Sequence, residues 1–103
     1  MGSTRTPPVF LNTGAGQPPN NKTITTVSTE ILAANSNRVW CFLTNDGFQD
    51  VWIAVGHPAV VGKGIFLAKN GGKEKIDLNA HNNEAINGIV AADTSTVALQ
   101  EAI

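Results

Sequence analysis

Cysteine, tyrosine and charged residues are all scarce in this chain of 103 residues. The single cysteine excludes an intramolecular disulfide, and the absence of tyrosine weighs against an aromatic platform for sugars. Charged residues make up 15% of the sequence, against about 25% in an average soluble domain, and the formal net charge is -1. The seven lysines and arginines are scattered, so no basic stripe predicts binding to nucleic acid.

Long apolar runs are also missing. No stretch approaches the roughly 18 residues that a membrane-spanning helix needs, so the sequence predicts no membrane contact. Hydrophobic residues nevertheless make up 42% of the chain, and this apolar content argues against disorder. We expect one compact domain, and its low charge is typical of a subunit that neighbours partly cover.

The first 22 residues differ in composition from the rest and hold four of the five prolines. Proline fixes φ and has no amide donor, so this segment predicts an extended arm rather than a helix or a central strand. An apolar cluster over residues 9–11 interrupts the arm. It predicts an anchor for a partner, with a flexible tail as the alternative reading. We therefore expect an N-terminal arm, residues 1–22, followed by a β-domain, residues 23–103.

Seven short runs with alternating or β-branched residues follow the arm. They cover residues 23–33, 38–44, 50–55, 64–68, 73–78, 85–92 and 96–103. Seven or eight strands at this spacing predict an all-β fold, either a small antiparallel β-sandwich or a jelly-roll-like barrel. The competing helical stretch, residues 28–35, is too short to be stable alone, and we expect at most one helical turn there.

Alternation along the strands predicts which side chains face the core. In residues 38–44, Val39, Cys41 and Leu43 share one face, and Trp40 and Phe42 share the other. By the same parity, the inward set of later strands is predicted to be Val51, Ile53, Val55, Ile76 and Leu78.

Two turn signals separate these strands. Asn45-Asp46-Gly47 and Asn70-Gly71-Gly72 both predict tight hairpins. The first hairpin would make the strands that carry Trp40 and Trp52 neighbours, so that both tryptophans share the face turned away from the core.

GHPAVVGKG, residues 56–64, is similar to a phosphate-binding loop but departs from its pattern. Gly56 and Gly62 are separated by one residue too many, and Gly64 stands where the loop needs a hydroxyl for Mg²⁺. A phosphate loop must also open a helix, whereas the residues after Lys63 indicate a strand. We interpret this stretch as a long connection between strands, with glycines at positive φ, Lys63 in solvent and an apolar tip that begins at Pro58.

No constellation of residues predicts catalysis. Cys41 lies within an apolar run, where a buried and inert thiol is expected. His57 and His81 have no ligand at metal-binding spacing, and the carboxylates form no evident acid/base pair. We expect no catalytic, cofactor-binding or metal-binding residue, and no enzyme activity.

The tryptophans and the apolar loops are candidates for contact with partners. Trp40 and Trp52 are either caps on the core, covered by the arm, or part of a subunit interface, where tryptophan is enriched. The candidate interface residues are Pro7, Pro8, Val9, Phe10, Leu11, Trp40, Trp52, Pro58 and Val60.

Two stretches of the β-domain carry a family resemblance. They are ILAANSNRVWCFLTNDGFQDVWIAVGHPAVVGKGIFLAKNGGKEKI and AINGIVAADTSTVALQE. This sequence resembles small β-rich virion proteins of tailed bacteriophages, which often carry an ILAAN-x-x-R entry, an N-x-G hairpin, a V-x-I-x-x-G-x-P-A strand end and a G-x-G-I-x-L strand. The resemblance covers roughly residues 24–101 and leaves out the arm. Its motifs are turn and core patterns, so no functional residue is carried over.

The resemblance implies a virion setting. With the arm and the low charge, it favours a capsid decoration (cement) protein at the capsid surface, assembled in the host cytoplasm, with the major capsid protein as partner. A homo-oligomer is expected, with a trimer favoured. A tail, fibre or head-tail component that faces the host or its glycans is the alternative, and a small enzyme or carbohydrate-binding domain is a third reading.

Overall fold

Eight short strands account for the regular secondary structure of residues 15–77 and 83–103, the parts of the chain that the computed structural model describes. They are β1 (Asn20–Ile24), β2 (Thr29–Leu32), β3 (Trp40–Asn45), β4 (Val51–Val55), β5 (Ile65–Leu67), β6 (Lys73–Ile76), β7 (Ile86–Val90) and β8 (Ser95–Ala102). Strand β2 lies in the stretch where at most one helical turn was expected, and no helical turn forms there. β-Branched residues and pairing with β7 override the weak helical propensity of these residues.

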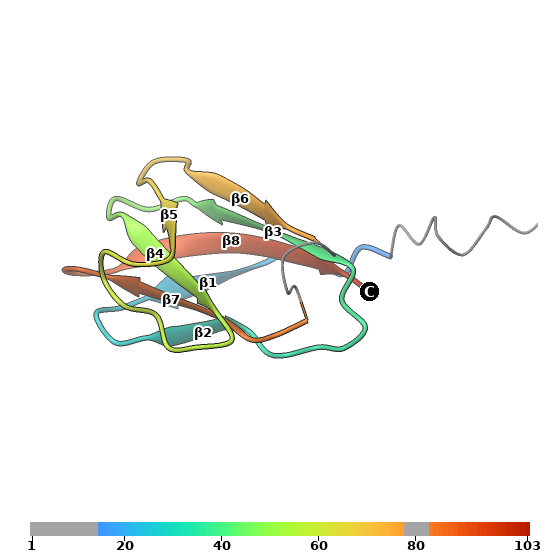
Figure 1. Ribbon diagram of the computed structural model, residues 1–103. Helices are drawn as coiled ribbons and strands as arrows, with labels where there is room; N and C mark the ends of the chain where they lie inside the picture. Colours follow the sequence, from blue (N-terminus) through green and yellow to red (C-terminus); the bar gives the residue numbers. More distant parts are fainter. Residues whose placement is uncertain (1–14, 78–82) are drawn as a thin grey trace, which may run out of the picture.

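The strands form two four-stranded antiparallel sheets that pack face to face (Figure 1). Sheet A has the order β1-β8-β3-β6, and sheet B has the order β2-β7-β4-β5. The pairs β1·β8, β2·β7, β3·β6 and β4·β5 are nested, as if one long hairpin had been rolled up. Eight strands paired in this way have jelly-roll order, and the predicted antiparallel β-sandwich is confirmed.

Most connections pass from one sheet to the other. Among the described strands, only β4 and β5 are consecutive in sequence and paired with each other. The turns at Asn45–Gly47 and Asn70–Gly72 therefore reverse the chain, but they join strands of opposite sheets. The two hairpins expected there are wrong, because turn residues specify a reversal and not the sheet that the next strand joins.

The core lies between the sheets, and the predicted alternation places it correctly. Cys41, Leu43, Val51 and Ile53 are fully or almost fully buried. Val39 and Ile76 are buried too, and Val55 packs against the core from its edge. The remaining inward candidate, Leu78, lies outside the described residues.

The last residue of β3 is a buried asparagine. The Asn45 side chain is fully buried, and its Nδ2 donates to the carbonyl oxygens of Leu67 (2.9 Å) and Gln49 (2.7 Å). Its Oδ1 accepts from the amide of Gly47 (3.1 Å) and the hydroxyl of Ser95 (2.7 Å). Asn45 thus links β3, β5 and β8, and so joins the two sheets.

A buried cation has the corresponding role near the opposite end of β3. Arg38 is 1% exposed, and its Nε donates to Oε2 of Glu101 at 2.8 Å. Its Nη1 donates to the carbonyl of Glu84 at 2.9 Å, and its Nη2 donates to the carbonyl of Ala33. The guanidinium therefore ties the β2–β3 and β6–β7 connections to β8, with its charge paired as a buried charge must be.

The N-terminal segment joins sheet A earlier than its composition indicates. Strand β1 begins at Asn20, so residues 20–22 of the predicted arm are part of the sheet. Further back, Gly16 forms a bridge with Ala102, and Ala15 and Ile103 exchange two backbone hydrogen bonds of 2.7 and 3.0 Å. The chain therefore enters the domain beside the C-terminal end of β8.

Candidate functional site

The outer face of each sheet carries a pair of aromatic rings. On sheet A, the rings of Trp40 and Phe42 lie edge to face with centroids 5.1 Å apart. Nζ of Lys75 lies 5.7 Å from the centre of the Phe42 ring, within the range of a cation–π contact. Phe42 is 44% exposed and Trp40 is half-buried, so this pair presents apolar surface to solvent.

The second pair lies on sheet B. Trp52 of β4 stands opposite Phe66 of β5, and their ring centroids are 5.6 Å apart. Phe66 is 54% exposed, whereas Trp52 is half-buried between Phe66 and Ile89, its partner in the register with β7. Both tryptophans face away from the core as expected. The prediction that they share one face is wrong, because β3 and β4 belong to different sheets and the rings lie on opposite outer surfaces.

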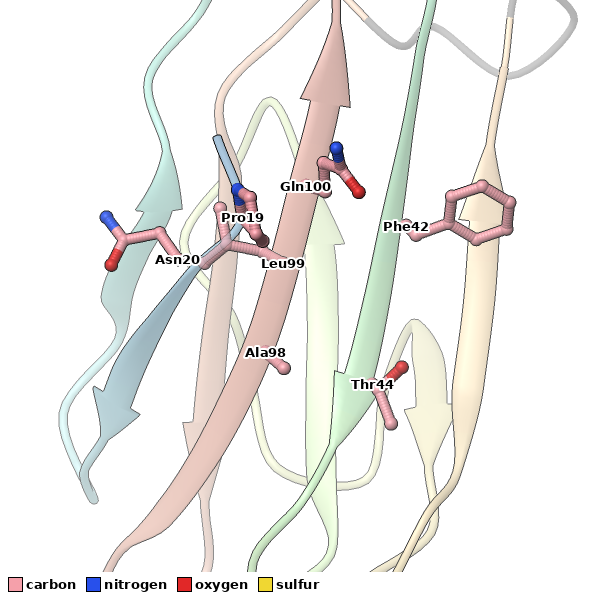
Figure 2. A pocket seen from close by; sticks show the side chains of 7 residues that line it. All are labelled: Pro19, Asn20, Phe42, Thr44, Ala98, Leu99 and Gln100. Atoms are coloured by element: carbon pink, nitrogen blue, oxygen red, sulfur yellow. The ribbon is translucent and has the colours of Figure 1, made fainter. Parts of the chain in front are cut away.

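A shallow hollow of about 210 Å³ lies on the outer face of sheet A (Figure 2). The small side chain of Ala98 on β8 leaves this space. Pro19 stands on one side of it, Phe42 and Thr44 stand on the other, and Gln100 closes one end. The lining is therefore mostly apolar, with the hydroxyl of Thr44 and the amide side chains of Asn20 and Gln100.

The loop that imitates a phosphate site connects β4 to β5. Gly56, Gly62 and Gly64 have φ of 77°, 84° and 87°, so these glycines supply the left-handed conformations that the connection requires. The strand β5 follows where a phosphate loop would need a helix. Lys63 is exposed, as predicted. The interpretation of residues 56–64 as a connection between strands is confirmed.

This loop is fixed to the sheet beneath it. The side chain of Asn87 donates to the carbonyl of His57 at 2.7 Å, and the amide of Ala59 donates to the hydroxyl of Ser28 at 2.8 Å. Ala59 is buried, whereas the candidates Pro58 and Val60 are exposed. The apolar tip is therefore held in place while its neighbouring side chains face solvent.

Sequence reasoning missed three exposed phenylalanines as interface candidates. Phe48, at the tip of the β3–β4 turn, is 82% exposed, more than Phe42 or Phe66. The turn itself is well fixed, since the amide of Asn70 donates to the carbonyl of Gly47 and the Gln49 side chain contacts Asp93. An aromatic residue directly after an Asn-Asp-Gly turn was a signal that could have identified Phe48.

The arm candidates Pro7, Pro8, Val9, Phe10 and Leu11 lie outside the described residues, and the structure does not place them. The remaining candidates do not form one site. Trp40 lies on sheet A, whereas Trp52, Pro58 and Val60 belong to sheet B or to the loop that leads into it.

Cys41 is buried, as the sequence predicts. This thiol is fully buried, and burial raises its pKa from 9.0 to about 11. Within the described ranges, no group of three or more histidine, cysteine, aspartate or glutamate side chains is arranged to hold a metal ion. His57 is exposed, and His81 lies outside those ranges. The same ranges contain no helix long and apolar enough to cross a bilayer.

Comparison of this chain with protein-family models, with curated proteins and with solved structures finds no match.

Proposed function

We propose that this protein is a structural protein of a bacteriophage virion that decorates the assembled capsid and binds the major capsid protein. The observation that carries the proposal is the exposed apolar surface of sheet B. Phe66 is 54% exposed beside Trp52, and Val60 and Val61, at 50% and 41%, are exposed in the loop that leads into the same strand. Large apolar side chains held outward on rigid elements are typical of protein interfaces.

The form of the surface supports binding to a protein shell rather than to a charged ligand. The loop tip is fixed by Asn87 and Ser28, so the apolar side chains need little ordering when a partner covers them. A small domain that binds only the assembled shell would stabilise that state by mass action. The resemblance of residues 24–101 to small virion proteins supports the same setting, as does a jelly-roll order that recurs among viral capsid proteins.

The direct test is the number of copies of this chain in each particle, measured by quantitative mass spectrometry on purified virions. Hundreds of copies support capsid decoration, because a shell offers hundreds of equivalent subunits. A few dozen copies or fewer would replace capsid decoration by a tail or connector role. Absence from the particle would overturn both.

A matched pair of variants tests which surface is used. Phe66→Ser should reduce binding to capsids that lack this protein, with little change in stability, because the side chain is half-exposed. Phe48→Ser is the control, since it removes an even more exposed phenylalanine from the β3–β4 turn. Loss of binding with Phe48→Ser alone would refute the assignment to sheet B.

A further inference from the structure

The hollow on the outer face of sheet A lies next to the point where the N-terminal segment joins the domain. Pro19 forms one of its walls. Gln100, at its end, donates from Nε2 to the carbonyl of Gln17 at 2.9 Å. The segment before residue 15 therefore begins within a few residues of a partly empty apolar site.

The dimensions of the hollow suit an extended peptide. Strands β1 and β3 flank β8 in the sheet, and the short side chain of Ala98 leaves the hollow open along β8, the direction that an extended chain would follow. Its volume of about 210 Å³ is below the roughly 300 Å³ at which small-molecule pockets begin. No charged side chain lines it, and Thr44 and Gln100 supply groups that can bond a peptide backbone.

The chain itself contains a segment with matching chemistry. Residues 6–14, TPPVFLNTG, carry no charge and combine two prolines with three large apolar residues. Consecutive prolines favour the extended polyproline conformation, which lowers the entropy lost when such a segment docks into an aromatic-lined groove. Phe42, whose ring contacts that of Trp40, forms the aromatic side of this groove.

We propose that residues 7–11 of a second copy of this chain occupy the hollow above Ala98, so that copies of the protein exchange their N-terminal segments. The direction of the chain favours a second copy over the same copy. Gly16 and Ala15 pair with Ala102 and Ile103, which directs the preceding residues past the end of β8 and away from Ala98. Phe10 is five residues beyond Ala15, a reach of roughly 17 Å for an extended chain.

Docking in the same copy would require the chain to reverse its direction between Ala15 and Phe10, because the chain, followed back from residue 17 to residue 15, runs toward the C-terminal end of β8. Docking in a second copy requires no such reversal.

Cross-linking between two different variants distinguishes exchange from self-docking. A mixture of Phe10→Cys and Thr44→Cys chains, mildly oxidised, should yield a disulfide between position 10 of one chain and position 44 of the other, identified by mass spectrometry. The native Cys41 stays out of the reaction because it is fully buried. Phe48→Cys replaces Thr44→Cys as the control, since position 48 is exposed in the β3–β4 turn and does not line the hollow.

Self-association provides the second measurement, by analytical ultracentrifugation of the full chain. Phe10→Ala, which removes one large apolar side chain, should weaken association about 10- to 100-fold while its circular dichroism spectrum stays that of the folded chain. Ala98→Glu, which fills the hollow with a charge, should weaken it at least as much. A monomer at every concentration, unchanged association of Phe10→Ala, or a 10–44 disulfide formed only when one chain carries both cysteines would overturn the proposal. Capsid binding of these variants is a separate matter, because the proposed shell contact lies on sheet B.

Discussion

Replacing Asn45 by alanine should destabilise the domain more than any other polar substitution of similar size. The variant leaves the carbonyl of Leu67, the amide of Gly47 and the hydroxyl of Ser95 without the partner that each has in the native protein. Each of these groups is buried, and a buried polar group that loses its partner costs about 1–3 kcal/mol. We expect a total loss of about 3–5 kcal/mol in the free energy of unfolding, allowing for some entry of water.

This loss is large against the total stability of such a domain. A chain of 103 residues has a free energy of unfolding of about 5–15 kcal/mol. Urea denaturation followed by tryptophan fluorescence measures the change, with an unchanged m-value as the sign that the unfolded state is the same. Asn21→Ala is the matched control, because this asparagine is exposed on β1 and should cost less than about 0.5 kcal/mol.

A double-mutant cycle with Ser95→Ala tests the mechanism. Alone, Ser95→Ala removes one hydrogen bond and should cost about 1 kcal/mol. In the Asn45→Ala background it should cost nothing or restore stability, because it removes a hydroxyl that has already lost its partner. A cost below about 1 kcal/mol for Asn45→Ala, or strict additivity of the two substitutions, would refute this reasoning.

Further variants and conditions test other parts of the structure. Arg38→Met should lower the free energy of unfolding, measured by urea denaturation, by about 3–5 kcal/mol, because it removes one partner of a buried ion pair with Glu101. A loss below about 1 kcal/mol would contradict the structural role of this cation. Native Cys41 should not react with a thiol reagent at pH 8, and unfolding in urea should expose it; rapid reaction of the native protein would contradict the burial. The pKa of Cys41 rises from 9.0 to about 11 on folding, so stability should fall as pH rises between these values, and Cys41→Ala should flatten that decline. Gly47→Ala should lower the stability of the domain more than Gly62→Ala. The Cβ added at position 47 would overlap Ser95 and the backbone of Thr96, whereas the space around Gly62 is open and only its φ of 84° opposes a side chain. Equal thermal midpoints of the two variants would contradict this ranking.

The side-chain alternation could be read from the sequence because it depends only on neighbouring residues. Cys41 and Leu43 had to face one way and Phe42 the other in any extended strand, and the structure buries the first two and exposes the third. The glycines of residues 56–64 were similarly readable, since glycine readily adopts the positive φ values that turns in a connection require.

The partner strands could not be predicted in this way. Asn45-Asp46-Gly47 serves equally well in a hairpin and in a connection between two sheets, and only contacts distant in sequence decide between them. Here the decisive contacts are those of the Asn45 side chain with Leu67 and Ser95, which are 22 and 50 residues away. The same lack of long-range information led to the wrong prediction that the two tryptophans share one face, and it hid the exposure of Phe48.

The hollow above Ala98 was beyond prediction for a related reason. It exists because β8 lies between β1 and β3, so that a small residue near the C-terminus stands between Pro19 and Phe42. None of these residues is unusual in its local sequence. Only the sheet order brings them together.

The central place of β8 in sheet A also determines when this sheet can form. Strand β8 follows all the other strands in sequence, and it is the strand with which both β1 and β3 pair. Until β8 has been synthesised, β1 has no partner in its sheet and β3 can pair only with β6. Sheet A is therefore completed last, and a truncation that removes part of β8 would damage the centre of the sheet rather than its margin.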